Sequence, residues 1–158
     1  MPSPIPHDTV ATAVLELFDE TFSRVQGIYL DRGTSLFETL EAISAEQASR
    51  PMGGEGSTIA AHVAHVIYYL EVLERYLLTH DAGAVDWGEV WRSVHAVDEA
   101  GWNALRERLR ATSARIREQL AGFDDWGVPD RLTESLGIVI HSSHHLGEIR
   151  QALCWLRG

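Results

Sequence analysis

Apolar residues recur every three or four positions through four long stretches, and this spacing most constrains the fold of the chain. The stretches cover about residues 8–29, 57–80, 98–120 and 133–156. Such a period places the apolar side chains on one face of an α-helix, where they must pack against other helices. No stretch shows the alternation with tight turns that is typical of β-hairpins. The sequence therefore predicts an all-α protein, a four-helix bundle with long connections, as one domain over residues 1–158.

The connections between these stretches carry their own signals. A shorter helix is expected over residues 35–48, where Ser35 and Glu38 have the spacing of a capping box. Pro51–Gly56 is the clearest loop, and Thr58 or Ser57 can cap the helix that follows it. The connection over residues 81–97 is too long for a tight turn and leaves room for a crossover, so the spacing leaves the order of the helices in the bundle open.

The charge balance narrows the classes of partner. The chain has 23 acidic and 13 basic residues, a formal net charge of −10. A basic face for phosphate contacts is not expected, which argues against nucleic acid and anionic membranes as partners. All the bases are Arg, so a lysine Schiff base and a P-loop lysine are excluded.

Cysteine usage and the amino terminus point to a cellular compartment. Cys154 is the single cysteine, so an intrachain disulfide and zinc sites that need two cysteines are excluded, and a small core residue is expected at this position. Residues 1–8 lack the apolar segment of a signal peptide, and no apolar run approaches the roughly 20 residues needed to span a bilayer. We expect a cytoplasmic protein without a membrane partner.

Histidines gather on two of the expected helices. His62 and His65 share one helix, and His141, His144 and His145 share the last, where Glu148 lies on the same stripe. At 100° per residue this stripe borders the apolar face of the last helix. A lone histidine on such a face is usually a hydrogen-bonded core residue, and two histidines four positions apart also occur by chance.

Three of these histidines have the spacing of a metal site. Two histidines at i and i+4 can reach one divalent ion, and a third from a facing helix completes a three-nitrogen site with an open position. Bundle cores often hold metals in this way. Nitrogen donors without paired cysteines favour Zn²⁺, Ni²⁺ or Fe²⁺.

The run from His141 to Gln151, HSSHHLGEIRQ, resembles the last-helix signature of the DinB-like superfamily. Residues 58–65 and the tryptophans around residues 87–102 resemble two weaker family motifs. The resemblance implies a DinB/YfiT-like four-helix bundle with a divalent ion on His65, His141 and His145. His65 is preferred because it lies seven residues after Thr58, as in the family pattern. The chain departs from the family at His144, where Tyr is common.

The resemblance also implies an enzyme class. Some members transfer low-molecular-weight thiols such as mycothiol or bacillithiol, and the absence of Lys fits a high-GC genome, where mycothiol occurs. A metal-dependent hydrolase and a non-catalytic metal-binding or structural module remain alternatives. Glu148, Tyr68 and Tyr69 are the candidate catalytic residues, although each is also explained as a solvated acid or a core aromatic. His62 and His144 remain open as extra ligands or polar neighbours.

A homodimer is the expected assembly. Two-fold dimers are the commonest assembly of small proteins, and the family resemblance points the same way. Five tryptophans are more than four helices of this length readily hide, and the connection over residues 81–97 contains two of them.

Overall fold

The computed structural model describes residues 5–52 and 56–157 and contains helices without strands over these ranges. The four long helices are α1 (His7–Phe22), α4 (Ile59–Thr79), α6 (Glu99–Ala121) and α7 (Arg131–Arg157). Three short helices lie in the connections: α2 (Leu36–Glu41), α3 (Ala45–Ala48) and α5 (Glu89–Ser93). The predicted all-α class and the positions of α4, α6 and α7 are confirmed.

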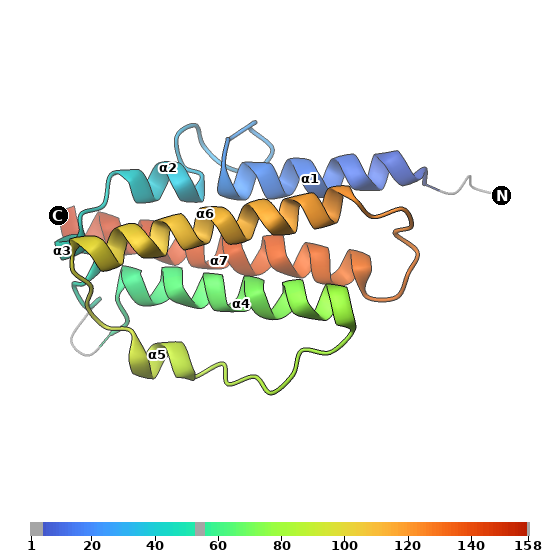
Figure 1. Ribbon diagram of the computed structural model, residues 1–158. Helices are drawn as coiled ribbons and strands as arrows, with labels where there is room; N and C mark the ends of the chain where they lie inside the picture. Colours follow the sequence, from blue (N-terminus) through green and yellow to red (C-terminus); the bar gives the residue numbers. More distant parts are fainter. Residues whose placement is uncertain (1–4, 53–55, 158) are drawn as a thin grey trace.

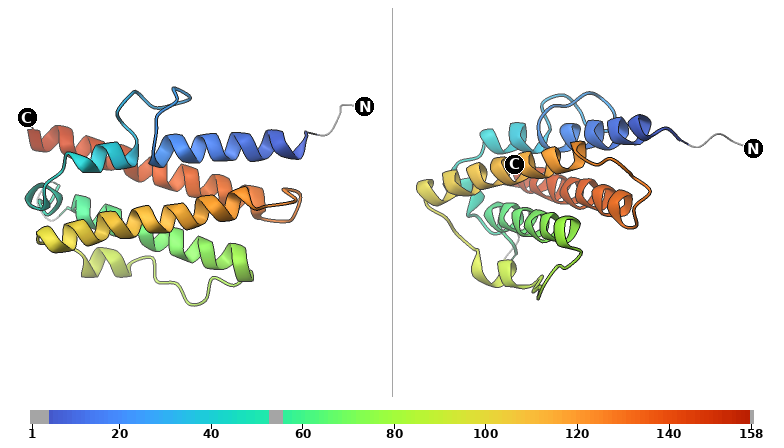
Figure 2. Two further views of the ribbon diagram at one scale, coloured as in Figure 1. Left: turned by 45° about the horizontal axis from the view of Figure 1, so that its top comes forward. Right: turned by 45° about the vertical axis from the view of Figure 1, so that its right-hand side comes forward.

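The long helices pack as a bundle in which α1 and α4 lie on opposite sides of α6 and α7 (Figure 1). The chain passes along α4, returns along the connection that contains α5, and then runs along α6 in the same direction as α4. The connection over residues 81–97 is therefore a crossover, and the bundle is not a simple up-down-up-down array. The right-hand view of Figure 2 shows α5 beside α4, on the side away from α1.

The first helix ends seven residues earlier than the sequence predicts. Segment 23–30 leaves the helix because the buried carboxylate of Glu20 accepts hydrogen bonds from the backbone N–H groups of residues 26, 28, 29 and 30, at 2.7–3.0 Å. Gly27 turns the chain there with a φ of +86°. Burial alone would raise the pKa of Glu20, but the four donors together lower it to about 2.

The predicted helix over residues 35–48 is two helices. Ser35 and Glu38 form the expected capping box at α2, but Ser44 and Gln47 form a second box that begins α3. The apolar spacing predicts one helix here, but the second capping box starts a new helix because its side chains bind the backbone in place of the helical hydrogen bonds. The buried indole of Trp102 on α6 donates to the carbonyl of Ile43 at 2.7 Å and fixes the break against the core.

Over residues 131–156 of α7, the exposed positions carry no formal charge. These positions are Leu132, Thr133, Ile140, His144, Gly147, Gln151, Cys154 and Trp155. The expectation that Cys154 is a core residue is wrong, because its position in the turn faces outward while Ala152 and Leu153 face the core. Within the described ranges, no helix combines the length and apolar character needed to cross a bilayer.

Candidate metal centre

His65, His141 and His145 meet between α4 and α7. The Nε2 atoms of His65 and His141 lie 3.3 Å apart, and the three residues offer ligand atoms that all lie within 4.8 Å of one another. The i, i+4 spacing on α7 puts two imidazoles on one face, and the packing of α4 against α7 brings His65 to them. The structure thus brings together all three residues of the expected ligand set, which we call the three-histidine cluster.

The chemistry of the cluster fits a divalent cation. Burial lowers the pKa of His65, and burial together with the neighbouring imidazoles lowers that of His141 and His145 to about 3. All three imidazoles are therefore neutral near pH 7, which is the form that binds metals. The buried Nδ1 atoms of His65 and His141 have no hydrogen-bond partner. The facing Nε2 atoms of His65 and His141 are thus neutral nitrogens close enough to bind one divalent cation together with His145.

Glu148 is placed to orient His145. One carboxylate oxygen lies 2.8 Å from Nδ1 of His145 and 3.3 Å from Nδ1 of His62, and the other lies 3.4 Å from Nε2 of His144. A carboxylate that accepts the Nδ1 proton leaves Nε2 of His145 as the metal-binding nitrogen. Glu148 therefore contacts the cluster, and its catalytic role stays a prediction.

His62 is buried beside the cluster and links it to the cavity that opens next to it. Its Nδ1 lies 3.0 Å from Nδ1 of His145, and its Nε2 lies 2.8 Å from the hydroxyl of Ser57. His62, His145 and Glu148 also offer ligand atoms within 4.8 Å of one another, so a second donor set shares His145 with the first. Burial lowers the pKa of His62, although the carboxylate of Glu148 opposes this shift.

Aromatic rings cover the cluster. Trp91 on α5 lies with its ring 4.7 Å from that of His65 and 5.0 Å from that of His62. Tyr69 stacks on His141 at 3.7 Å with an interplanar angle of 9°. The crossover therefore brings a tryptophan onto the histidines, which the spacing of the sequence alone could not place.

The two candidate tyrosines have different surroundings. The hydroxyl of Tyr68 accepts a hydrogen bond from the backbone N–H of Asp86 at 3.1 Å and so anchors the crossover. Burial and the nearby charge of Glu134 raise the pKa of Tyr69, which keeps its hydroxyl protonated at neutral pH. The contacts of Tyr69 with His141 make it a positioning residue. His144 is 66% exposed and lies at the edge of the site, 3.4 Å from Glu148 and with its ring 5.2 Å from that of His145.

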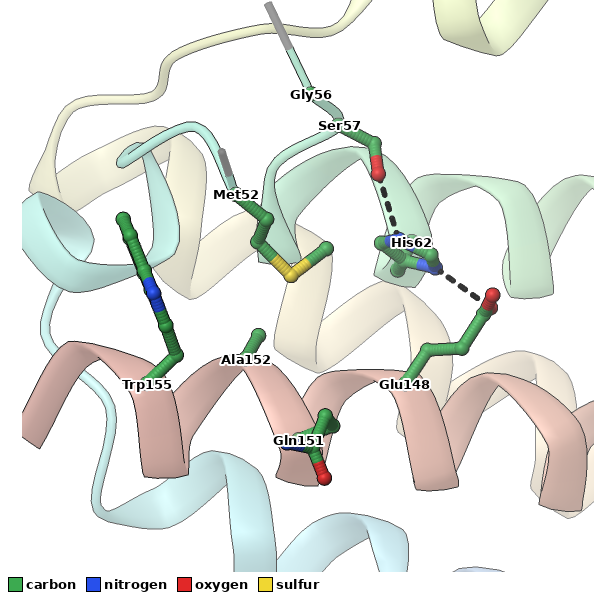
Figure 3. A pocket seen from close by; sticks show the side chains of 8 residues that line it. All are labelled: Met52, Gly56, Ser57, His62, Glu148, Gln151, Ala152 and Trp155. Atoms are coloured by element: carbon green, nitrogen blue, oxygen red, sulfur yellow. Dashed lines mark hydrogen bonds and ion pairs between the residues drawn. The ribbon is translucent and has the colours of Figure 1, made fainter. Parts of the chain in front are cut away.

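A cavity of about 470 Å³ opens beside the cluster (Figure 3). It is lined by Met52, Gly56, Ser57, His62, Glu148, Gln151, Ala152 and Trp155. The dashed contacts in Figure 3 join His62 to Ser57 on one side and to Glu148 on the other. Of the predicted Pro51–Gly56 loop, residues 53–55 lie outside the described ranges, and its ends are joined by a 3.1 Å hydrogen bond from the N–H of Met52 to the carbonyl of Ser57.

Comparison with known proteins agrees with this geometry. A family model described as the DinB superfamily matches residues 29–149, a range that contains His65, His141, His145 and Glu148. Neither the curated proteins nor the solved structures gave a significant match.

Proposed function

Because the chain belongs to the DinB superfamily, we propose that it is a metal-dependent enzyme that transfers a low-molecular-weight thiol, of the mycothiol or bacillithiol kind, to a small acceptor. The observation that carries this proposal is the three-histidine cluster, in which buried, neutral imidazoles from two helices converge within 4.8 Å. Three protein ligands with a cavity beside them are typical of a catalytic metal site, since a structural site is usually closed by a fourth ligand.

His65, His141 and His145 would hold the ion, with Zn²⁺, Ni²⁺ or Fe²⁺ as the candidates. A bound divalent ion supplies Lewis acidity that lowers the pKa of a neighbouring thiol or water. One carboxylate oxygen of Glu148 lies 2.8 Å from Nδ1 of His145, which is close enough to favour a proton on that nitrogen and to position the ring. This carboxylate is 39% exposed, so it can also pass a proton from the thiol to solvent. Tyr69 stacks on His141 and fixes the plane of its ring, and Trp91 covers His65 from the side of the crossover.

A structural ion in a non-catalytic bundle is the main alternative. The core argues against it, because the buried apolar side chains of all four long helices form one continuous cluster that includes Phe18, Leu70, Trp102 and Ile149. A domain with such a core has no need of a metal to fold. A metal-dependent hydrolase uses the same cluster with water in place of the thiol, and the substrate assay separates the two.

The proposal is tested by elemental analysis of protein purified without a His tag, followed by assays with candidate thiols and with esters or amides. We expect about one divalent ion per chain and thiol-dependent consumption of an electrophile that stops after chelation and returns with metal. Protein that takes up no divalent ion at micromolar supply contradicts the proposal. If the protein takes up metal and hydrolyses esters or amides but shows no thiol-dependent turnover, it is a hydrolase and not a transferase.

We also propose that the protein forms a two-fold dimer through the outer surface of α7. Over residues 131–156, the exposed positions of this helix carry no formal charge and include Ile140, which is 67% exposed. In a chain with a net charge of −10, such a surface offers a contact with the least repulsion between copies. Sedimentation should give about twice the 17.6 kDa chain mass, and Ile140→Glu should give the monomer. A wild-type monomer at tens of micromolar in physiological salt contradicts the dimer.

A further inference from the structure

The cavity beside the three-histidine cluster has two chemically different ends (Figure 3). Ser57, His62 and Glu148 form the polar end, and the side chains of Met52, Ala152 and Trp155 form an apolar wall. Its volume of about 470 Å³ is in the range of roughly 300–1,000 Å³ found for small-molecule sites. An apolar wall with a few polar groups at one end is the usual arrangement of a site that both binds and orients a ligand.

The charge of the lining selects among ligands. Among the described lining residues, Glu148 is the only charged one, and none is basic. An anionic ligand would therefore be desolvated beside a carboxylate with no cation to pair with it, which is unfavourable. The apolar wall favours an aromatic or aliphatic body.

We propose that this cavity binds a small molecule that carries no negative charge and has an aromatic or aliphatic body, with its polar end beside Ser57 and His62. This inference rests on the proposed function, in which the molecule is the acceptor of the thiol. His62 and Glu148 line the cavity and also contact Nδ1 of His145, so the polar end of the ligand lies next to the three-histidine cluster. The transferable group and the cluster thus meet at one end of the cavity.

A pair of fluorescent probes tests the chemical class of the ligand. N-phenyl-1-naphthylamine is uncharged, and 1-anilinonaphthalene-8-sulfonate has the same ring system with one sulfonate. With the full-length, metal-free protein, we expect saturable one-to-one binding of the uncharged probe at least about tenfold tighter than that of the sulfonate. Equal or tighter binding of the sulfonate, or no saturable binding of the uncharged probe, overturns the inference.

Variants locate the probe in this cavity. Trp155 is 61% exposed, so Trp155→Ala removes part of the wall with little effect on the core, and Ala152→Trp fills the cavity from α7. We expect affinity for the uncharged probe to fall about fivefold or more in Trp155→Ala and to be lost in Ala152→Trp. Ala111→Trp, on the exposed side of α6, is the matched control and should bind as the wild type does.

The variant Glu148→Gln tests whether the charge of the lining, and not only the shape of the cavity, selects the ligand. This change removes the only charge of the described lining and should narrow the affinity difference between the two probes. An unchanged difference contradicts the role of the carboxylate in selection. Circular dichroism identifies a misfolded Ala152→Trp variant, in which case Trp155→Ala decides the location. Probe binding uses metal-free protein, so its failure is distinct from a failure of metal uptake.

Discussion

Glu20 on α1 and the three-histidine cluster between α4 and α7 are both polar groups enclosed by the core, but their hydrogen bonding differs. Glu20 is completely buried, and its two carboxylate oxygens accept four backbone N–H groups from residues 26–30. In the three-histidine cluster, Nδ1 of His65 and Nδ1 of His141 are buried without a partner.

This difference distinguishes a structural role from a ligand-binding role. A buried carboxylate with all its acceptors used stabilises the segment that supplies the donors. The buried imidazoles leave Nδ1 of His65 and Nδ1 of His141 unpaired, which costs stability, while their Nε2 atoms lie 3.3 Å apart in position to bind a cation. The two regions should therefore respond to substitution in opposite ways: one in stability, the other in metal affinity.

The largest expected effect is on metal binding. His141→Ala removes one of three nitrogen donors and should weaken binding of a divalent ion about 100-fold or more. The apo-protein should keep its helical circular dichroism at room temperature, because the core does not depend on His141. Isothermal titration with Zn²⁺ or Ni²⁺ measures the first effect. Collapse of the apo-variant would indicate a structural ion instead.

Glu20→Gln should have the complementary effect. The amide presents an NH₂ group to backbone donors that the carboxylate now satisfies, so the free energy of unfolding should fall by about 2 kcal/mol or more. Metal affinity of the folded protein should stay unchanged. Urea denaturation measures the loss, and Glu16→Gln, exposed one turn earlier on α1, is the control. A loss no larger than that of the control would show that the four hydrogen bonds do not hold segment 23–30.

The pH dependence of stability should separate the two regions in metal-free protein. The pKa of His141 and His145 is about 3 in the folded state and about 6.5 when unfolded, so the unfolded chain binds more protons between these values. Stability should therefore fall as the pH decreases below about 6.5. The pKa of Glu20 is about 2 in the folded state, against an ordinary value of 4.5. Its contribution to stability should therefore be lost only below about pH 4.5.

A single variant checks that the histidines cause the loss of stability that begins below about pH 6.5. His141→Phe removes one of the titrating imidazoles and should flatten the dependence between pH 6.5 and 5 while leaving the loss below pH 4.5 in place. Denaturant midpoints across the pH range provide the measurement. A wild-type protein whose stability is constant from pH 7 to 5 is incompatible with the lowered histidine pKa values.

The smallest effect is expected at His144. Its ring is 66% exposed and lies 3.4 Å from Glu148, so His144→Ala should change metal affinity by less than about twofold. Isothermal titration with Zn²⁺ or Ni²⁺, as for His141→Ala, measures this change in affinity. A loss comparable to that of His141→Ala would make His144 a ligand and would extend the cluster to the surface.

Local periodicity was enough to predict much of the candidate site. The positions of His141 and His145 on one face of α7 follow from their i, i+4 spacing. The same spacing left His62 and His65 as alternatives, because both lie on the inner side of α4. Only the packing of α4 on α7 shows that His65 joins His141, while His62 lies between His145 and Ser57.

In other parts of the chain, contacts that the residue pattern does not reveal made the structure differ from the prediction. The apolar period continues past Phe22 to Val25, but the amides of residues 26–30 bind Glu20 rather than the preceding turn. Trp91 has no periodic signal, since α5 has five residues and lies in a long crossover. Cys154 was placed in the core by its residue type, whereas its position on α7 faces outward.

The sequence by itself determined the helical class, the inner faces of the long helices and the presence of a histidine stripe on two of them, because these depend on residue spacing over a few turns. Only the tertiary structure decided which residue of α7 each histidine of α4 meets, how the crossover lays Trp91 over the rings, and where a cavity opens beside Glu148. Each of these depends on the relative position of segments far apart in the chain. Such positions are set by the packing of the whole core, which no local pattern encodes.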